Sequence, residues 1–169
     1  QGGMDLLVGG AGRDFMSGGE GNDSLYGQDG DDVMAGNGGR DYLSGGSGMD
    51  RMFGGRSNDT LFGGTGDDKI SGGKHDDAVR GEQGNDTLLG GSGNDNLMGG
   101  SGDDAIKGGS GRDRIEGGDN ADCILGQGGH DVIWGDNADG DSGGNESSDT
   151  IDGGNGNDWI SGGTDDDDI

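Results

Sequence analysis

Aspartate is the residue in this sequence whose spacing could do chemistry, because it recurs every nine residues along the chain. Carboxylates held side by side raise each other's pKa or attract a counter-ion. Ca²⁺ accepts about 6–8 hard oxygen ligands in flexible geometry, whereas Mg²⁺ demands a stricter octahedron and keeps its waters. Two carboxylates with nearby backbone carbonyls therefore suit one Ca²⁺ ion, and the repeated aspartates suit several such ions. The candidate metal ligands are Asp5, Asp14, Asp23, Asp32, Asp41, Asp50, Asp59, Asp68, Asp77, Asp86, Asp95, Asp104, Asp113, Asp122, Asp131, Asp149, Asp158 and Asp167.

Two further rows run in phase with the aspartates. A glycine lies five residues before each aspartate, from Gly9 to Gly162, and an aliphatic residue lies two residues after it, from Leu7 to Ile169. Only Gly140 breaks the aspartate row, and only Ser142 breaks the aliphatic row. Composition alone would indicate an acidic disordered segment. Three rows in register over the whole chain predict a repeat architecture instead.

The composition limits the kinds of partner that the chain can bind. The chain has 169 residues, 48 glycines, no proline and a net charge of -25. This charge argues against nucleic acid, which needs a basic patch, and against anionic membrane surfaces. No apolar run is long enough to cross a membrane, so membrane insertion is not expected. The partners that the sequence favours are calcium ions.

One repeat unit illustrates the expected fold. Gly90–Asp95 reads as a turn, in which glycine permits a tight backbone, and Asn96–Met98 as a three-residue strand that points Leu97 inward. Each unit reverses the chain, so two units make a coil of 18 residues. The sequence thus predicts an all-β fold, a parallel β-roll of two facing sheets. It forms a single domain, residues 1–169, of about nineteen units in roughly nine coils, on the order of 45 Å long.

Counting in steps of 18 assigns the aspartates to the two edges of the roll. Stacked carboxylates repel, and a core one aliphatic residue wide cannot hold them together without a counter-ion. One edge would carry Asp5, Asp23, Asp41, Asp59, Asp77, Asp95, Asp113, Asp131, Asp149 and Asp167. The other would carry Asp14, Asp32, Asp50, Asp68, Asp86, Asp104, Asp122 and Asp158, with a gap at Gly140.

The unit resembles the calcium-binding nonapeptide of the RTX (repeats-in-toxin) family, G-G-x-G-x-D-x-U-x with U a large aliphatic residue. Residues 18–26, Gly-Gly-Glu-Gly-Asn-Asp-Ser-Leu-Tyr, match it fully, and the resemblance covers the whole chain. It implies a right-handed, β-helix-like solenoid with calcium ions between turns 18 residues apart.

The resemblance also implies a ligand set for each ion. One turn gives its aspartate and the carbonyls of its second and fourth positions, and the next gives its aspartate and the carbonyls of its first and third. One site would join Gly91, Gly93 and Asp95 to Gly108, Ser110 and Asp113, and another would join Gly10, Gly12 and Asp14 to Gly27, Asp29 and Asp32. The other expected carbonyl ligands are Gly19, Gly21, Gly36, Gly45, Gly46, Gly48, Gly63, Gly64, Gly66, Gly81, Gly99, Gly100, Gly102, Gly109 and Gly111.

Residues 135–152 depart most from the pattern, because they contain Ala138, Gly140, Ser142 and Ser147 at row positions. We expect a defective coil or a protruding loop there, with one or two calcium sites lost or altered. Possible irregular ligands are Asp136, Asp139 and Asp141. Across the whole chain, the other second or fourth positions that are not glycine are Gln1, Gln28, Asn37, Ser57, His75, Glu82, Asn120, Gln127, Asn145 and Asp165.

The histidines, the cysteine and the aromatic residues are not expected to form a functional site. His75 and His130 fall on one edge three coils apart, about 14 Å, and are expected to be solvent-facing turn residues. Cys123, the single cysteine, is an incidental outward residue that allows no internal disulfide. The outward aromatic residues form no continuous row on either sheet and are expected to be scattered surface packing, with the two tryptophans packing locally with the irregular stretch: Phe15, Tyr26, Tyr42, Phe53, Phe62, Trp134 and Trp159.

The expected function is that of a calcium-binding structural module, not an enzyme, because no aspartate is paired with a nucleophile, base or pocket. Without calcium the chain should be disordered, and binding and folding should occur together. The family implies a secreted or cell-surface bacterial protein, exported unfolded. Two roles stay open: a rigid spacer in a matrix, adhesin or fibre, or the C-terminal RTX region of a secreted enzyme or toxin such as a protease, lipase or haemolysin. Both termini fall within a repeat, which suggests a portion of a longer array or end-to-end self-association.

Overall fold

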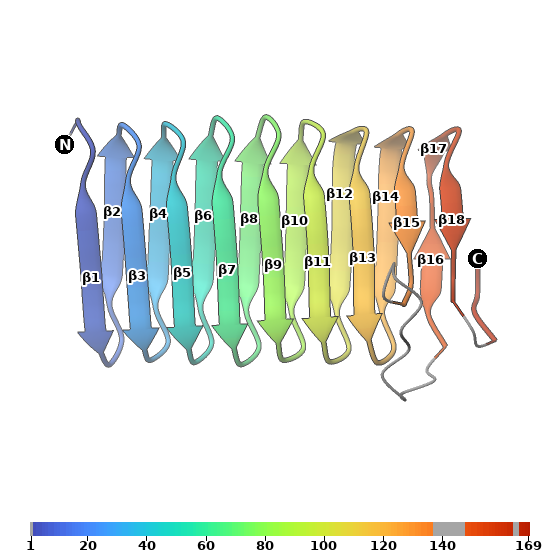
Figure 1. Cartoon of the computed structure of the whole chain (residues 1–169), viewed down its shortest axis with the longest axis horizontal. Helices are drawn as coiled ribbons and strands as arrows, with labels where there is room; N and C mark the ends of the chain where they lie inside the picture. The colour runs from blue at the N-terminus through green and yellow to red at the C-terminus, as the bar shows by residue number, and fades with distance from the viewer. Residues whose placement is uncertain (1, 137–147, 164–165) are drawn as a thin grey trace.

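The chain folds as a parallel β-roll of two stacked, nine-stranded sheets (Figure 1). The computed structural model describes residues 2–136, 148–163 and 166–169. Successive strands alternate between the sheets, and neighbours within each sheet run parallel. None of these described residues forms a helix long and apolar enough to cross a membrane. The predicted fold class is confirmed.

The two sheets divide the strands by odd and even repeat. The first sheet contains β1 (Leu6–Ala11), β3 (Ser24–Asp29), β5 (Tyr42–Ser47), β7 (Thr60–Thr65), β9 (Ala78–Gln83), β11 (Asn96–Ser101), β13 (Arg114–Asp119), β15 (Val132–Trp134) and β18 (Trp159–Ser161). The second contains β2 (Phe15–Glu20), β4 (Val33–Gly38), β6 (Arg51–Arg56), β8 (Lys69–Lys74), β10 (Thr87–Ser92), β12 (Ala105–Gly111), β14 (Cys123–Gly129), β16 (Thr150–Asp152) and β17 (Asn155–Gly156).

Most strands are twice as long as the sequence predicts. β11 continues past Met98 through the glycines to Ser101, where Gly100 pairs with Glu82. The expected turn is therefore partly strand. The reason is that stacked glycine backbones of successive coils lie close enough to extend the parallel hydrogen-bond ladder into the turn.

The core is the aliphatic row, as the pattern predicts. Leu25, Leu43, Leu61, Val79 and Leu97 pair in register within the first sheet and are fully buried. Complete burial of such a side chain is worth about 1.5–3 kcal/mol. Leu7 and Ile160, in the end coils, are only partly buried. Each coil is therefore stabilised mainly by packing against the coils on either side of it.

The regular register changes once, between residues 135 and 149. Ile124 of β14 pairs with Ile151 of β16, and Ile133 of β15 pairs with Ile160 of β18, so paired residues are 27 apart instead of 18. The extra nine residues equal one repeat unit, which leaves the rows in phase. Nine residues singled out in the sequence lie outside the described part of the chain: Gln1, Ala138, Asp139, Gly140, Asp141, Ser142, Asn145, Ser147 and Asp165.

This change corrects the predicted assignment of aspartates to edges. An odd number of units between paired strands exchanges the two edges. Asp149 follows Asp122, and Asp158 follows Asp131, as their hydrogen bonds show. Asp167 then continues from Asp149. The prediction placed Asp149 and Asp167 in the row of Asp131, and Asp158 in the row of Asp122, and both placements are wrong.

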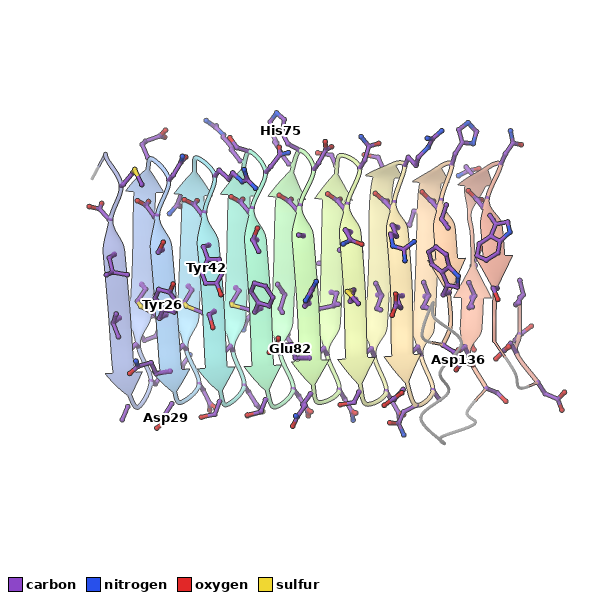
Figure 2. All side chains as sticks on the ribbon, viewed as in Figure 1. Tyr26, Asp29, Tyr42, His75, Glu82 and Asp136 are labelled. Atoms are coloured by element: carbon purple, nitrogen blue, oxygen red, sulfur yellow. The ribbon has the colours of Figure 1, made fainter. Side chains whose placement is uncertain are left out.

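Two aromatic clusters cover the outer face of the first sheet. Ring centroids of Tyr26 and Tyr42, and of Tyr42 and Phe62, lie 5.6 Å apart (Figure 2). The expectation of scattered aromatics is wrong for these three, because their contacts run diagonally across strands and not along one row. The centroids of Trp134 and Trp159 lie 5.2 Å apart and link β15 to β18 across the register change.

Candidate metal centre

The repeating aspartates stand at the turns, immediately before each strand. From Asp23 to Asp149 those of both rows are buried, with 0–3% of each residue exposed. Asp5 and Asp14, in the first coils, and Asp158 and Asp167, in the last, are partly exposed. The strand that follows each aspartate fixes its backbone, so the carboxylates of successive coils face one another along both edges.

The two oxygens of each carboxylate have different surroundings. Oδ1 accepts the backbone N–H of the aspartate one coil earlier, at 2.7–3.0 Å throughout the stack. For example, Asp95 accepts from Asp77, and Asp113 accepts from Asp95. One oxygen of each carboxylate is thus used in a hydrogen bond that links successive coils.

The second oxygen is buried and has no hydrogen-bond partner. A buried carboxylate oxygen without a partner is strongly unfavourable in a folded protein. Its repetition from Asp14 to Asp131 indicates a designed site for a cation and not chance mispacking. The oxygens concerned are Oδ2 of Asp14, Asp23, Asp32, Asp41, Asp50, Asp59, Asp68, Asp77, Asp86, Asp95, Asp104, Asp113, Asp122 and Asp131.

The first glycine of each unit keeps space beside this oxygen. A Cβ on Gly90 would lie 2.5 Å from Asp95 Oδ2 and 2.5 Å from the carbonyl oxygen of Gly108 in the next coil. A Cβ on Gly9 would lie 2.7 Å from Asp14 Oδ2 and 2.9 Å from the Gly27 oxygen. A carboxylate and a carbonyl from successive coils therefore converge at one point, where no side chain fits.

Backbone carbonyls add further oxygens between the turns. Gly91 and Gly93 have φ of 116° and 140°, a left-handed region that favours glycine. A Cβ on Gly109 or Gly111 would strike their respective carbonyl oxygens, so both carbonyls face the next coil. In that coil, the Ser110 carbonyl faces back and accepts the Gly93 N–H at 2.9 Å.

Non-glycine residues at these positions also have a positive φ. They have φ of 75–80° and include His75 and Glu82, which lie on opposite edges of the roll (Figure 2). Holding an ordinary residue there costs about 1–3 kcal/mol, so the turn geometry overrides local preference. The residues are Gln28, Asn37, Ser57, His75, Glu82, Asn120 and Gln127.

Burial raises the pKa of these carboxyls. It raises the pKa of Asp122 to about 8 and that of Asp104 to about 7, mainly by desolvation, with the charge of neighbouring aspartates adding to the effect. The backbone N–H bonds lower the pKa but do not compensate. Carboxylates in this state favour either protons or a cation, and a divalent cation would hold them ionised.

The oxygens of the turns fit calcium. All are hard ligands, and most are carbonyls on a backbone that cannot contract to an ideal octahedron, which favours Ca²⁺ over Mg²⁺. Within the described ranges no three His, Cys, Asp or Glu side chains converge on one point. A site of this design does not need them, since backbone carbonyls outnumber carboxylates.

Comparison with known families agrees with this geometry. The model of the RTX calcium-binding nonapeptide repeat matches residues 1–34, 26–61, 53–88, 72–106, 89–122, 107–141 and 143–169. The chain belongs to this RTX repeat family. It is a calcium-binding repeat module. No curated protein matches the sequence.

A second ladder in the RTX turns was not foreseen from the sequence. The residue before each repeating aspartate is often Asn or Asp, and its Oδ1 accepts a backbone N–H from the next coil, as Asn22 does from Arg40 and Asp67 does from Asn85. His130 takes this place at the register change, where its Nδ1 accepts the Asn157 N–H at 2.8 Å. The recurrence of Asn and Asp at this position was the available signal.

The three remaining candidates are His75, Cys123 and Asp136. His75 is exposed, as expected, and its Nδ1 accepts the Ser57 N–H at 3.3 Å. Cys123 is an exposed free thiol. The N–H of Asp136 donates to the Gly162 carbonyl at 3.2 Å, so this residue joins the coil after the register change. Its role as an irregular ligand stays a prediction.

Proposed function

We propose that the module folds when it binds calcium outside the cell and then serves as a rigid spacer in a matrix, adhesin or fibre. Each ion would lie between successive coils. It would take one turn's aspartate with its second and fourth carbonyls, and the next turn's aspartate with its first and third. Asp95 and Asp113 would share one such ion with the carbonyls of Gly91, Gly93, Gly108 and Ser110.

The observation that carries the proposal is the row of buried, unpartnered Oδ2 atoms. Because the ligands come from two coils, the site exists only when those coils are stacked, so binding energy is folding energy. The hydrophobic core supplies one aliphatic side chain per unit. Calcium therefore has to offset the carboxylate repulsion that this core cannot.

A calcium titration followed by far-UV circular dichroism tests coupled folding. We expect a cooperative gain of β-structure with calcium, reversed by a chelator and not produced by magnesium at the same concentration. Cooperativity follows because each coil stabilises its neighbours. A chain that keeps its β-structure after exhaustive chelation would refute the proposal.

A pair of isosteric variants locates the ions. Asp95→Asn removes a charge from a proposed ligand and should raise the calcium concentration at the folding midpoint. Asp67→Asn removes the same charge from the outer ladder, where Asn85 already occurs one coil later, and should leave the midpoint unchanged. Equal effects of both variants would indicate a general charge effect and not a site at Asp95.

The spacer role is tested separately by small-angle scattering of the calcium-loaded protein. A rod whose length follows the strand spacing of about 4.8 Å per coil is expected. Concentration-dependent lengthening would support a fibre element. The competing role, as the repeat region of a secreted enzyme or toxin, would be supported by a catalytic domain in the same gene product.

A further inference from the structure

The outer face of the second sheet carries a groove with no acidic lining residue. One hollow of about 180 Å³ is lined on its surface by Arg51, Phe53, Lys69, Ser71, Thr87 and Leu89. A second hollow of about 250 Å³ adjoins it, shares Ser71 and Leu89, and reaches Lys107 and Gln127. We call these two hollows together the sheet groove.

The order of residues along one row creates the groove. Phe53, Ser71, Leu89 and Lys107 occupy equivalent positions on β6, β8, β10 and β12 and pair in register. The small side chain of Ser71 lies between Phe53 and Leu89, which are 46% and 39% exposed. The result is a depression with apolar walls, open along the sheet from β6 to β14, about 19 Å at the usual strand spacing.

The charge of the groove contrasts with the rest of the chain. Arg51 lies directly opposite Lys69, and on the same two strands Arg56 lies opposite Lys74, outside the groove in a separate hollow that Glu20 also lines. Like charges in directly opposed positions destabilise a sheet. None of these four exposed cations forms an ion pair with another described residue. These cations form a local basic surface on a chain whose net charge is -25, and such a surface can bind an anion.

We propose that the sheet groove binds an acidic polysaccharide, a chain of sugar rings that carry carboxylates. Phe53 and Leu89 offer the apolar surface on which the flat face of a sugar ring packs. The hydroxyls of Ser71 and Thr87 match sugar hydroxyls. Arg51, Lys69 and Lys107 supply the cations for carboxylates, and the Arg51 guanidinium can bind one through two parallel hydrogen bonds.

Two other anionic partners fit less well. An extended peptide binds a sheet by adding a strand at a free edge, but β6, β8 and β10 are each paired on both sides. A nucleic acid carries about one charge per 1.7 Å of duplex, and the acidic edges of the roll would repel it. A glycan with one carboxylate per ring places fewer charges near those edges and still reaches the cations.

Isothermal titration calorimetry with a short oligogalacturonate tests this assignment. The inference requires the folded roll, so circular dichroism in saturating calcium first confirms that each protein is folded. We expect binding that weakens with added salt. The double variant Arg51→Gln/Lys69→Gln should weaken it about tenfold, the factor expected for two exposed charge contacts. Phe53→Ala should weaken binding while leaving its salt dependence unchanged.

A matched control removes two charges elsewhere. Arg13→Gln/Arg112→Gln takes away exposed cations that do not line the groove, and its affinity should equal that of the unaltered chain. Equal loss in both double variants would overturn the proposal in favour of general electrostatics. Unchanged binding by the groove variants would indicate that calcium on the acidic edges bridges the sugar. An oligoglutamate that binds as tightly as the oligogalacturonate would overturn the polysaccharide in favour of acidic peptides. No binding to the folded chain would also refute it.

Discussion

The regular stack from β1 to β14 and the coils that follow residue 135 use the same repeat differently. In the first region paired residues are 18 apart and most strands have six residues. In the second, β16 and β18 have three residues each, and they pair with β14 and β15 at a step of 27. The roll therefore accepts an additional whole unit between coils, because nine residues return the chain to the same row.

The two regions also differ in how completely the turns are enclosed. Asp86 and Asp95 are buried between coils on both sides, whereas Asp158 and Asp167 are partly exposed. Ile160 is likewise less buried than Leu97. We expect the coils after residue 135 to open before the regular stack. Trp134 and Trp159, the two tryptophans of the chain, report on that region by fluorescence.

The largest expected effect is the response of the ion-free protein to pH, which acts on the regular stack. Burial raises the pKa of Asp59, Asp68 and Asp77 from 3.8 to about 7 and that of Asp122 to about 8. Stabilisation by a group with a raised pKa is complete below 3.8 and lost as pH rises through the folded value. In chelator, β-structure measured by circular dichroism should increase as pH falls from 8 towards 4.

Calcium should weaken this dependence, because protons and calcium compete for the same carboxylates of the folded roll. At a fixed calcium concentration near the midpoint, lowering the pH below about 6 should release calcium while the β-structure is kept, since Asp95 and Asp113 exchange the ion for protons near that value. An ion-free protein that becomes less structured towards pH 4 would contradict this account of the carboxylates.

The next largest effect is expected from truncation of core side chains, which should destabilise the two regions to different extents. Leu97→Ala removes a fully buried side chain of the regular stack and should lower the free energy of unfolding by about 2–5 kcal/mol. Ile160→Ala, in the partly buried end coil, should cost less and should act mainly on the tryptophan signal. Chemical denaturation in saturating calcium, followed by both signals, makes the comparison. Equal losses would mean that both regions unfold as one unit.

Adding a methyl group at a glycine tests how closely the turns are packed. Gly90→Ala places a Cβ against Asp95 Oδ2 and the Gly108 carbonyl and should cost about 1–3 kcal/mol, as for other overpacked sites. Gly128→Ala, beside the register change, meets its nearest atom at 3.8 Å and has ordinary backbone, so it should change stability by less than about 0.5 kcal/mol. Thermal unfolding at fixed calcium measures both. A silent Gly90→Ala would show that this space is not filled by ligand oxygens.

The smallest effect is expected for removal of one unit. Deletion of residues 138–146 would shorten the step between paired strands from 27 to 18 and leave every described pairing in phase. The melting temperature in calcium should stay within a few degrees. A deletion of four residues in the same place serves as the comparison. A large loss from the nine-residue deletion alone would show that this unit stabilises the stack.

The rows predicted most of the fold because each had one physical cause. In each unit the core needs an inward side chain such as Leu97, the turn needs a glycine beside Asp95, and the site needs the carboxylate itself. Because these three requirements share one period, that period determined the sheets and the edges. The register change was not predictable in detail. Since Asp149 and Ile151 remain in phase with the earlier rows, an additional unit between coils and a stacked unit look alike in the sequence.

Other features escaped prediction because they depend on neighbouring coils. The contact of Tyr42 with Tyr26 and Phe62 joins residues 16 and 20 apart, which no row of equivalent positions contains. Likewise, the acceptance of the Asp77 N–H by Asp95 requires the stacked coils to be known. The sequence predicted which residues line the turns, while three-dimensional stacking decides which oxygen of each carboxylate lacks a partner.

The direction of the hydrogen bonds has a mechanical consequence. The bonds between coils run along the length of the roll, so tension applied to the two chain ends loads the coils in series and detaches them one after another. Each regular coil would release 18 residues, about 60 Å of extended chain, and the step at the register change would release 27, about 90 Å. The roll would thus yield in discrete, reversible steps and absorb a pull without rupture of a covalent bond.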